Sequence, residues 1–171
     1  KLIELNKKYK FIKKNTNLLD IGAYPGGWSQ VSSKIISTGK ILSLDVKKMD
    51  QLKNVSFLKC DFLEESTKAK ILKFFKDKLD VVISDMAANT TGNKSLDCIR
   101  TNQLCADVVE FSSKILKPNG VLVSKLFMGD DFLEVKELAK SRFKKVSFFK
   151  PEASRNESKE TYLHCVTLRT L

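Results

Sequence analysis

The residues best suited to chemistry stand at or just beyond the ends of short apolar segments. They are four carboxylates and one amine: Asp20, Asp45, Asp61, Asp85 and Lys125. In open sheets of parallel strands, ligands bind beyond the carboxyl ends of the strands. We therefore expect these side chains to share one edge of a sheet. Carboxylates there can accept hydrogen bonds from hydroxyl groups, and a lysine can exchange a proton.

A glycine-containing loop follows the first of these apolar segments. Residues 20–30 read DIGAYPGGWSQ. Glycine lets the backbone turn tightly and approach a ligand, and the N-terminus of a following helix offers free N–H groups. The loop lacks the G-x-G-x-x-G pattern of dinucleotide sites, and Pro25 removes an N–H group that a pyrophosphate would use. The loop therefore favours a cofactor with a ribose and a base but no phosphate, and it argues against an NAD-type oxidoreductase.

Neighbouring residues suggest how this cofactor would be held. Gly26 lies in the turn, Asp45 is placed to accept hydrogen bonds from both ribose hydroxyls, and Asp61 adds a carboxylate to the same edge. Trp28 offers an aromatic wall for the base. The alternative for Trp28 is a place in the hydrophobic core behind a tight turn.

The apolar pattern predicts the elements that must position these residues. Strands are expected at 18–21, 41–45, 55–58, 81–85, 121–126, 146–149 and 162–168, and helices at about 27–37, 65–77, 98–116 and 130–142. Such alternation is typical of an α/β fold with a mostly parallel sheet and helices on both faces. A polar stretch joins the last two strands, which favours an antiparallel hairpin. The length of 171 residues fits one domain.

The positive charge is concentrated at the two ends of the chain. The formal net charge is +11. Residues 1–15 and residues 136–171 each carry a balance of +5, whereas the 120 residues between them carry only +1. Each cluster could be a solvated helix face. Alternatively, the two ends form one surface for a polyanion, which requires them to meet in space.

Four motifs, in order along the chain, resemble those of the FtsJ-like ribose 2′-O-methyltransferases of ribosomal RNA. They are DIGAYPGGWSQ at 20–30, SDMAAN at 84–89, VSKLFMG at 123–129, and KPEASR with SKETY at 150–162. Ala88 replaces the proline of the family's second motif. The resemblance implies an S-adenosylmethionine-dependent Rossmann-like fold with seven strands and an antiparallel last hairpin. It also implies S-adenosylmethionine as the cofactor, S-adenosylhomocysteine as the product, and no metal.

The resemblance further implies a catalytic tetrad of two lysines and two acids. Asp85, which also belongs to the cofactor edge, Lys125 and Glu160 match three members, with Glu160 in the polar stretch before the last strand. Lys1 of KLIEL matches the first lysine, which the family carries in a helix ahead of strand one. Methyl transfer to a hydroxyl needs a base, and burial or a second ammonium lets a lysine serve. Lys125 is therefore the expected general base.

The implied reaction is methylation of a uridine ribose in the peptidyl-transferase region of large-subunit ribosomal RNA. The expected partner is this RNA within the large subunit, and the expected protein is a cytoplasmic monomer. Another RNA, such as a tRNA or an mRNA cap, remains an alternative substrate, as does a non-catalytic RNA-binding role. Methyltransferases of base amino groups are disfavoured because Asp85 is followed by Met-Ala-Ala rather than Pro-Pro-aromatic.

The remaining composition excludes other classes of protein. The four cysteines contain no C-x-x-C pair and there is one histidine, His164, so a zinc site is not expected. The free thiols suit a reducing cytosol. No apolar run is long enough to span a membrane. The chain opens at Lys1 without methionine, so we expect further residues upstream.

Overall fold

A computed structural model describes residues 1–170, and its strands form one sheet in the order β3-β2-β1-β4-β5-β7-β6. The strands are β1 Leu18–Ile21, β2 Ile41–Asp45, β3 Ser56–Lys59, β4 Leu79–Ser84, β5 Leu116–Phe127, β6 Phe143–Phe149 and β7 Glu160–Leu168. Strands β1 to β5 pair in parallel with one another, whereas β7 runs antiparallel to both β5 and β6. The predicted seven-stranded, mostly parallel sheet with an antiparallel last hairpin is confirmed.

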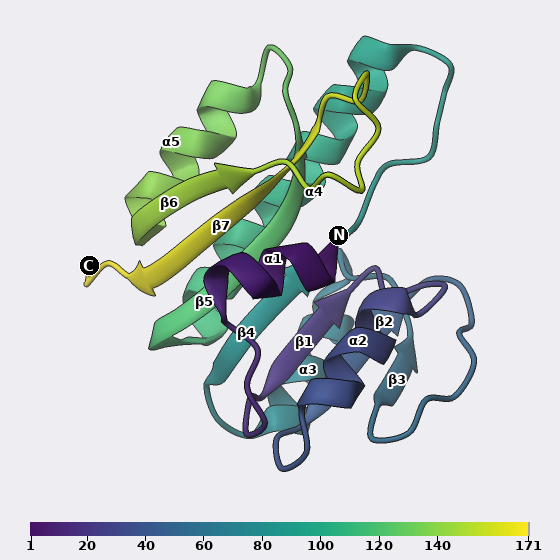
Figure 1. The fold of residues 1–171 in the computed structure, drawn as a ribbon, viewed down its shortest axis with the longest axis vertical. Coiled ribbons are helices and arrows are strands. Elements are labelled where there is room, and N and C mark those ends of the chain that lie inside the picture. The colour runs from purple at the N-terminus through teal and green to yellow at the C-terminus, as the bar shows by residue number, and fades with distance from the viewer. Residues whose placement is uncertain (171) are drawn as a thin grey trace.

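Within residues 1–170, five helices cover both faces of this sheet (Figure 1). They are α1 Leu2–Tyr9, α2 Gly27–Ile35, α3 Glu65–Phe75, α4 Lys94–Ile115 and α5 Phe132–Arg142. Helices α1 and α2 lie on one face, and α3, α4 and α5 lie on the other. Within residues 1–170, each helix is either too short or too polar to cross a bilayer.

The central strands contribute to two hydrophobic cores because successive side chains of a strand point to opposite faces. In β1, Leu18 packs in the core under α1 and α2, whereas Leu19 packs in the core under α3 and α4. Leu2 and Leu5 of α1 pack in the same core as Leu18. Strands that are buried on both faces explain the continuous apolar runs of the sequence.

Two elements differ from those expected from the apolar pattern. Helix α1 was not among the four helices that the pattern indicated, since only Leu2 and Leu5 of its eight residues are buried. Strand β7 begins at Glu160, which pairs with Phe127 of β5, so Glu160 lies on a strand and not in the preceding polar stretch. Both differences affect the candidate site.

Candidate active site

Four side chains from distant parts of the chain meet beside the end of β4. The Nζ atom of Lys125 lies 3.1 Å from Oδ1 of Asp85 and 3.7 Å from Oε2 of Glu160. The other oxygen of Glu160, Oε1, lies 2.6 Å from Nζ of Lys1. The Glu160 carboxylate therefore separates two ammonium groups, and the structure brings together all four residues that the resemblance indicated.

The sheet register explains how three of these residues come together. Asp85 directly follows β4, and Lys125 lies on the neighbouring strand β5 one residue beyond the last β4–β5 pair, Ser84 with Ser124. Antiparallel pairing places Tyr162 of β7 opposite Lys125. Glu160 stands two residues earlier on β7 and therefore on the same face as Tyr162.

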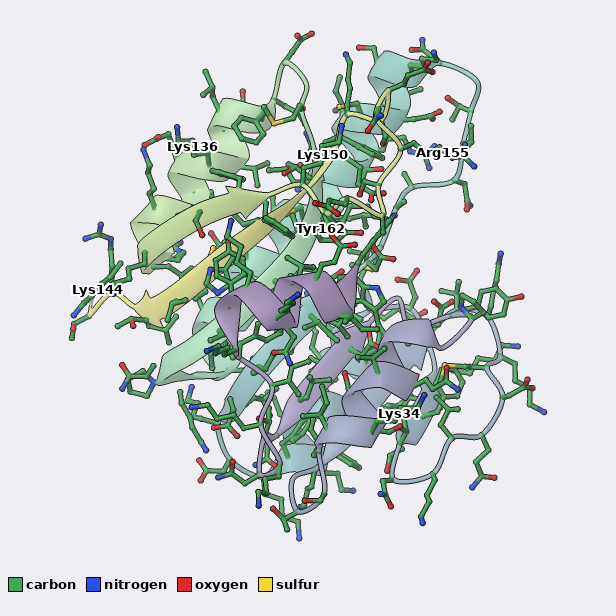
Figure 2. The ribbon with its side chains drawn as sticks, in the orientation of Figure 1. Lys34, Lys136, Lys144, Lys150, Arg155 and Tyr162 are labelled. Atoms are coloured by element: carbon green, nitrogen blue, oxygen red, sulfur yellow. The ribbon has the colours of Figure 1, made fainter. Side chains whose placement is uncertain are left out.

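Tyr162 links the two carboxylates of the cluster. Its side chain is fully buried, and its hydroxyl lies 2.6 Å from Oδ1 of Asp85, to which it donates, and 3.3 Å from Oε1 of Glu160. Burial and the two nearby carboxylates raise the pKa of Tyr162, so its hydroxyl stays protonated. Figure 2 shows Tyr162 between α1 and the loop that carries Lys150 and Arg155. Tyr162 falls within the last sequence motif, but nothing in the pattern indicated this role.

Glu160 remains charged although it is largely buried. Burial acts to raise the pKa of its carboxyl group, but the hydrogen bond from Lys1 and the charges of Lys125 and Lys1 outweigh burial and lower that pKa. Ser154, which is also buried, donates a further hydrogen bond of 3.1 Å to Oε1 of Glu160. The cluster is thus a fixed ionic network with 11% of the Lys125 side chain exposed.

The start of helix α1 is held at two points, one on the β6–β7 loop and one on the first residue of β7. Lys1 precedes the helix and contacts Glu160, as described above. Three residues later, the carboxylate of Glu4 accepts hydrogen bonds from the backbone N–H groups of Glu152, at 2.7 Å, and Ala153, at 3.1 Å. Residues i and i+3 share one face of a helix, so both contacts are made by the same face.

A cavity of about 250 Å³ lies at the carboxyl ends of β1, β2 and β4, and Asp85 forms part of its wall. Its acidic lining consists of Asp45, Asp61 and Asp85, and its apolar lining includes Val46 and Phe62. Asp45 is oriented by two backbone N–H groups, from Tyr24 at 3.0 Å and Lys47 at 2.8 Å. A carboxylate has about four acceptor sites, so Asp45 can still accept hydrogen bonds from hydroxyl groups.

The two residues of the glycine loop that we expected at the cofactor do not line this cavity. Gly26 has a φ of +116°, and a Cβ atom there would lie 2.9 Å from Sδ of Met49, so this position requires glycine for the turn and for packing. Trp28 packs in the core beneath α1, with its ring centroid 5.5 Å from that of Tyr162. Gly22, with a φ of +74°, does line the cavity.

Asp20 lies inside the sheet and not at its acidic edge, where the sequence pattern had grouped it. Its side chain is fully buried in β1, and Oδ2 accepts a hydrogen bond of 2.7 Å from Ser29 at the start of α2. Burial raises the pKa of Asp20 to about 7, an effect increased by the charges of Asp85 and Asp45 and opposed by the Ser29 hydrogen bond. The edge itself therefore carries three of the four expected carboxylates.

The donors and acceptors of the cavity fit a nucleoside that carries a positive charge. Three carboxylates and one lysine, Lys47, face this space, so its balance is negative. Such a lining suits hydroxyl groups and a cation and opposes a pyrophosphate. The apolar side chains of Val46, Phe62 and Leu104 provide surface for a flat base. The site therefore fits S-adenosylmethionine, which combines a base, a ribose and a sulfonium.

Comparisons with known proteins agree with this geometry. A family model described as FtsJ-like methyltransferase matches residues 1–168. The ribosomal RNA large subunit methyltransferase E of Pelagibacter ubique (strain HTCC1062) is 44% identical over 169 residues, which cover 99% of this chain and 83% of that protein. The protein of the same name from Rickettsia akari (strain Hartford) is also 44% identical, over 95% of this chain and 74% of that protein.

Solved structures extend the similarity to the fold. A Plasmodium falciparum protein assigned as a ribosomal RNA methyltransferase superposes with a TM-score of 0.85 at 30% identity, over 98% of this chain and 94% of that one. Human methyltransferase-like protein 13, solved in complex with S-adenosylhomocysteine, superposes with a TM-score of 0.68 at 17% identity, over 96% and 77% of the two chains. Because the family model spans residues 1–168 and the relatives match over almost the full length, this chain belongs to the FtsJ-like methyltransferase family.

Proposed function

We propose that this protein transfers a methyl group from S-adenosylmethionine to a ribose 2′-hydroxyl of large-subunit ribosomal RNA. The observation that carries the proposal is the position of Lys125, held by Asp85 and Glu160 beside the acidic cavity. The names of the relatives from Pelagibacter and Rickettsia support this substrate class. We further propose that the target is a uridine in the peptidyl-transferase region, and that the protein acts as a single-domain monomer in the cytoplasm.

In this proposal, the cofactor is held by the carboxylates of Asp45 and Asp61 and by the apolar wall of the cavity. When bound, S-adenosylmethionine supplies a methyl group on a sulfonium sulfur; the carbon–sulfur bond breaks as the carbon–oxygen bond to the ribose forms. In its neutral amine form, Nζ of Lys125 removes the proton of the attacking hydroxyl and becomes the ammonium that Asp85 and Glu160 bind. General-base catalysis of this kind is worth about 10²–10⁴-fold in rate.

The other members of the cluster position Lys125. Asp85 binds Nζ through its side chain and also through its backbone carbonyl, at 3.0 Å. Glu160 lies between Lys125 and Lys1, so a shift of Lys1 also affects the contact between Glu160 and Lys125. We propose that Lys1 acts through Glu160 and also contributes positive charge beside the bound RNA.

The basic ends of the chain supply a surface for the RNA. They meet, as an RNA-binding role requires: Nζ of Lys8 in α1 lies 4.4 Å from the ring centroid of Phe149 in β6, and Tyr9 stacks on His164 of β7 at 3.7 Å. Lysines that contact phosphates give affinity without sequence preference. We propose that this surface holds the strand on either side of the target ribose.

The test is incubation of the protein with S-adenosylmethionine carrying a tritiated methyl group and with unmodified large-subunit ribosomal RNA or large subunits. We expect label in the RNA, on a ribose 2′-oxygen of a uridine, and its position is mapped by resistance to alkaline cleavage. Parallel incubations with tRNA and with capped mRNA test the alternative substrates. Label only in tRNA or cap would refute the ribosomal assignment, and no label in any RNA would favour a non-catalytic binding role.

Lys125→Ala tests the assignment of the base. We expect a loss of methyl transfer of at least 10²-fold, because the hydroxyl proton then has no acceptor of this kind. The affinity for S-adenosylhomocysteine, measured by calorimetry, should be retained. Lys117→Ala is the matched control. Lys117 lies on the same strand, outside the cluster, and its Nζ atom is 2.7 Å from Oδ1 of Asp80. Equal activity of the two variants would refute the role of Lys125.

A further inference from the structure

A second and larger cavity, of about 620 Å³, adjoins the cluster of Lys1, Asp85, Lys125 and Glu160. Three of its walls continue from the segments that carry cluster residues: residues 87–90 follow Asp85, residues 127–130 follow Lys125, and residues 157–159 precede Glu160. The first turns of α4 form the fourth wall. Figure 1 shows the start of α4 beside the β6–β7 loop. Ala87 lines both this cavity and the acidic one, so the two are neighbours.

Hydrogen bonds from buried side chains fix the walls of this second cavity. The backbone N–H of Ala88 donates to Oγ1 of Thr101 at 3.1 Å, a bond that proline at position 88 could not make. The Asn102 side chain accepts from the N–H of Phe127 at 2.8 Å and donates to its carbonyl at 3.0 Å. The cavity is therefore preformed, as sites for small molecules usually are.

The lining suits a nucleobase better than a phosphate. Lys94 and Lys159 are opposed by the carboxylates of Asp97, Asp130 and Glu157, so the cavity has no excess of positive charge. Apolar surface comes from Ala87, Phe127 and Ile99, and 47% of Ile99 is exposed. Hydroxyl groups of Thr90, Ser95 and Ser158 can bond to the polar edge of a base.

We infer that this cavity receives the base of the nucleotide whose ribose reacts at Lys125. The inference rests on the proposed function. The ribose then lies at the cluster, between the acidic cavity, which Asp85 and Ala87 line, and the base cavity, which Ala87 and Ala88 line. A base must leave its stack to enter such a pocket, which favours single-stranded or loop RNA over duplex.

Ile99→Trp tests the inference because it fills the mouth of the cavity at an exposed position. Leu96→Trp is the matched control: Leu96 lies on the same helix, is 43% exposed and does not line the cavity. With whichever ribosomal substrate the wild type methylates, we expect Ile99→Trp to raise KM at least tenfold and Leu96→Trp to change KM less than twofold. Affinity for S-adenosylhomocysteine should be equal in all three proteins and verifies that they are folded.

The salt dependence of KM separates a base from a phosphate. Filling a base pocket leaves the slope of log KM against log salt unchanged, whereas loss of one phosphate contact reduces it by about one. Equal KM values for the two tryptophan variants would overturn the inference, and so would a changed slope for Ile99→Trp. Failure of the proposed function gives a different result: the wild type itself then methylates no RNA, whatever the two tryptophan variants do.

Discussion

At the scale of single residues, burial acts on two carboxyl groups with different results. Asp20 is fully buried and Glu160 is largely buried, yet the pKa of Asp20 is raised and that of Glu160 is lowered. The difference lies in their partners. Asp20 has one hydroxyl partner, Ser29, and its Oδ1 has no hydrogen-bond partner among the described residues, whereas Glu160 faces two ammonium groups. Charge compensation therefore keeps the carboxylate of the cluster ionised.

Asp20 should make stability fall as pH rises. Its pKa is about 7 in the folded protein against 3.8 as the reference, so the folded state binds the proton more tightly, and this stabilisation is lost as pH rises through 7. We expect a loss of about 2–3 kcal/mol between pH 5 and pH 8. The Asp20→Asn variant should not show this loss of stability.

The measurement is urea denaturation of wild type and Asp20→Asn at both pH values. The difference between the two free energies of unfolding, variant minus wild type, should be larger at pH 8 than at pH 5. The comparison with the variant is needed because His164 acts in the opposite sense: burial and Lys8 lower its pKa from 6.5 to about 4. Stability from His164 is present above pH 6.5 and is lost as pH falls toward 4. Parallel pH curves of the two proteins would contradict the assignment to Asp20.

Asp45 should determine the affinity for the cofactor. We expect Asp45→Ala to raise the Kd for S-adenosylhomocysteine at least tenfold, because charge-assisted hydrogen bonds to hydroxyl groups are lost. Calorimetric titration measures this change. Asp50→Ala is the control, since Asp50 is exposed nearby and does not line the acidic cavity. An unchanged Kd for Asp45→Ala would exclude Asp45 as a cofactor ligand.

At the scale of elements, α1 and the β6–β7 loop form one unit around Glu160. Glu4 holds the start of the loop, and Lys1 holds Glu160 just after the loop ends. Ser154, between these points, also donates to Glu160. A short helix with two buried leucines, Leu2 and Leu5, thus positions a residue more than 150 positions away in sequence.

Glu4→Ala should therefore reduce kcat and spare cofactor binding. We expect a decrease of about tenfold, because small displacements in an active site are costly to rate. Hydrogen exchange should become faster at the amides of Glu152 and Ala153. Glu65→Ala serves as the control, since Glu65 also lies in the first turn of a helix, α3, on the opposite face of the sheet. Unchanged exchange at both amides would refute the attachment.

At the scale of the whole molecule, the separation of charge along the chain becomes a separation in space. The acidic residues of the middle segment include Asp45, Asp61 and Asp85 at the cavity, and the basic ends meet where α1 packs on β6 and β7. On β6, Lys145 is exposed on the same face of the strand as Ser147, whose hydroxyl contacts Tyr9 of α1 at 3.4 Å.

RNA affinity should depend on this face, to which α1 adds Lys7, an exposed residue of its last turn. We expect the double variant Lys7→Ala with Lys145→Ala to raise KM for RNA and to reduce its salt slope by up to two, one for each lost phosphate contact. Lys70→Ala with Lys73→Ala removes the same charge from α3 on the opposite face and should leave the slope unchanged. The two slopes are compared between 50 and about 200 mM salt. Equal salt slopes of KM in the two double variants would show that the RNA does not bind to the face formed by α1 and β6.

The sequence pattern by itself determined the architecture and two of the four residues of the cluster. Alternation of apolar strands and helices is a local pattern, so the order and type of most elements could be predicted. Asp85 and Lys125 could be located from strand ends, since parallel strands place their ends at one edge. Lys1 and Glu160 required the family resemblance, because a lysine or a glutamate in a polar stretch carries no local signal.

Only the tertiary structure decided which side chains meet and which are buried. Trp28 and Asp20 carry the same local signals as cavity residues, yet Asp20 is fully buried in β1 and Trp28 packs, partly buried, against the core under α1 and α2. The roles of Tyr162 and Glu4 depend on partners 77 and 148 residues away. Contacts over such separations follow from strand pairing and helix packing, and no period of the sequence encodes them.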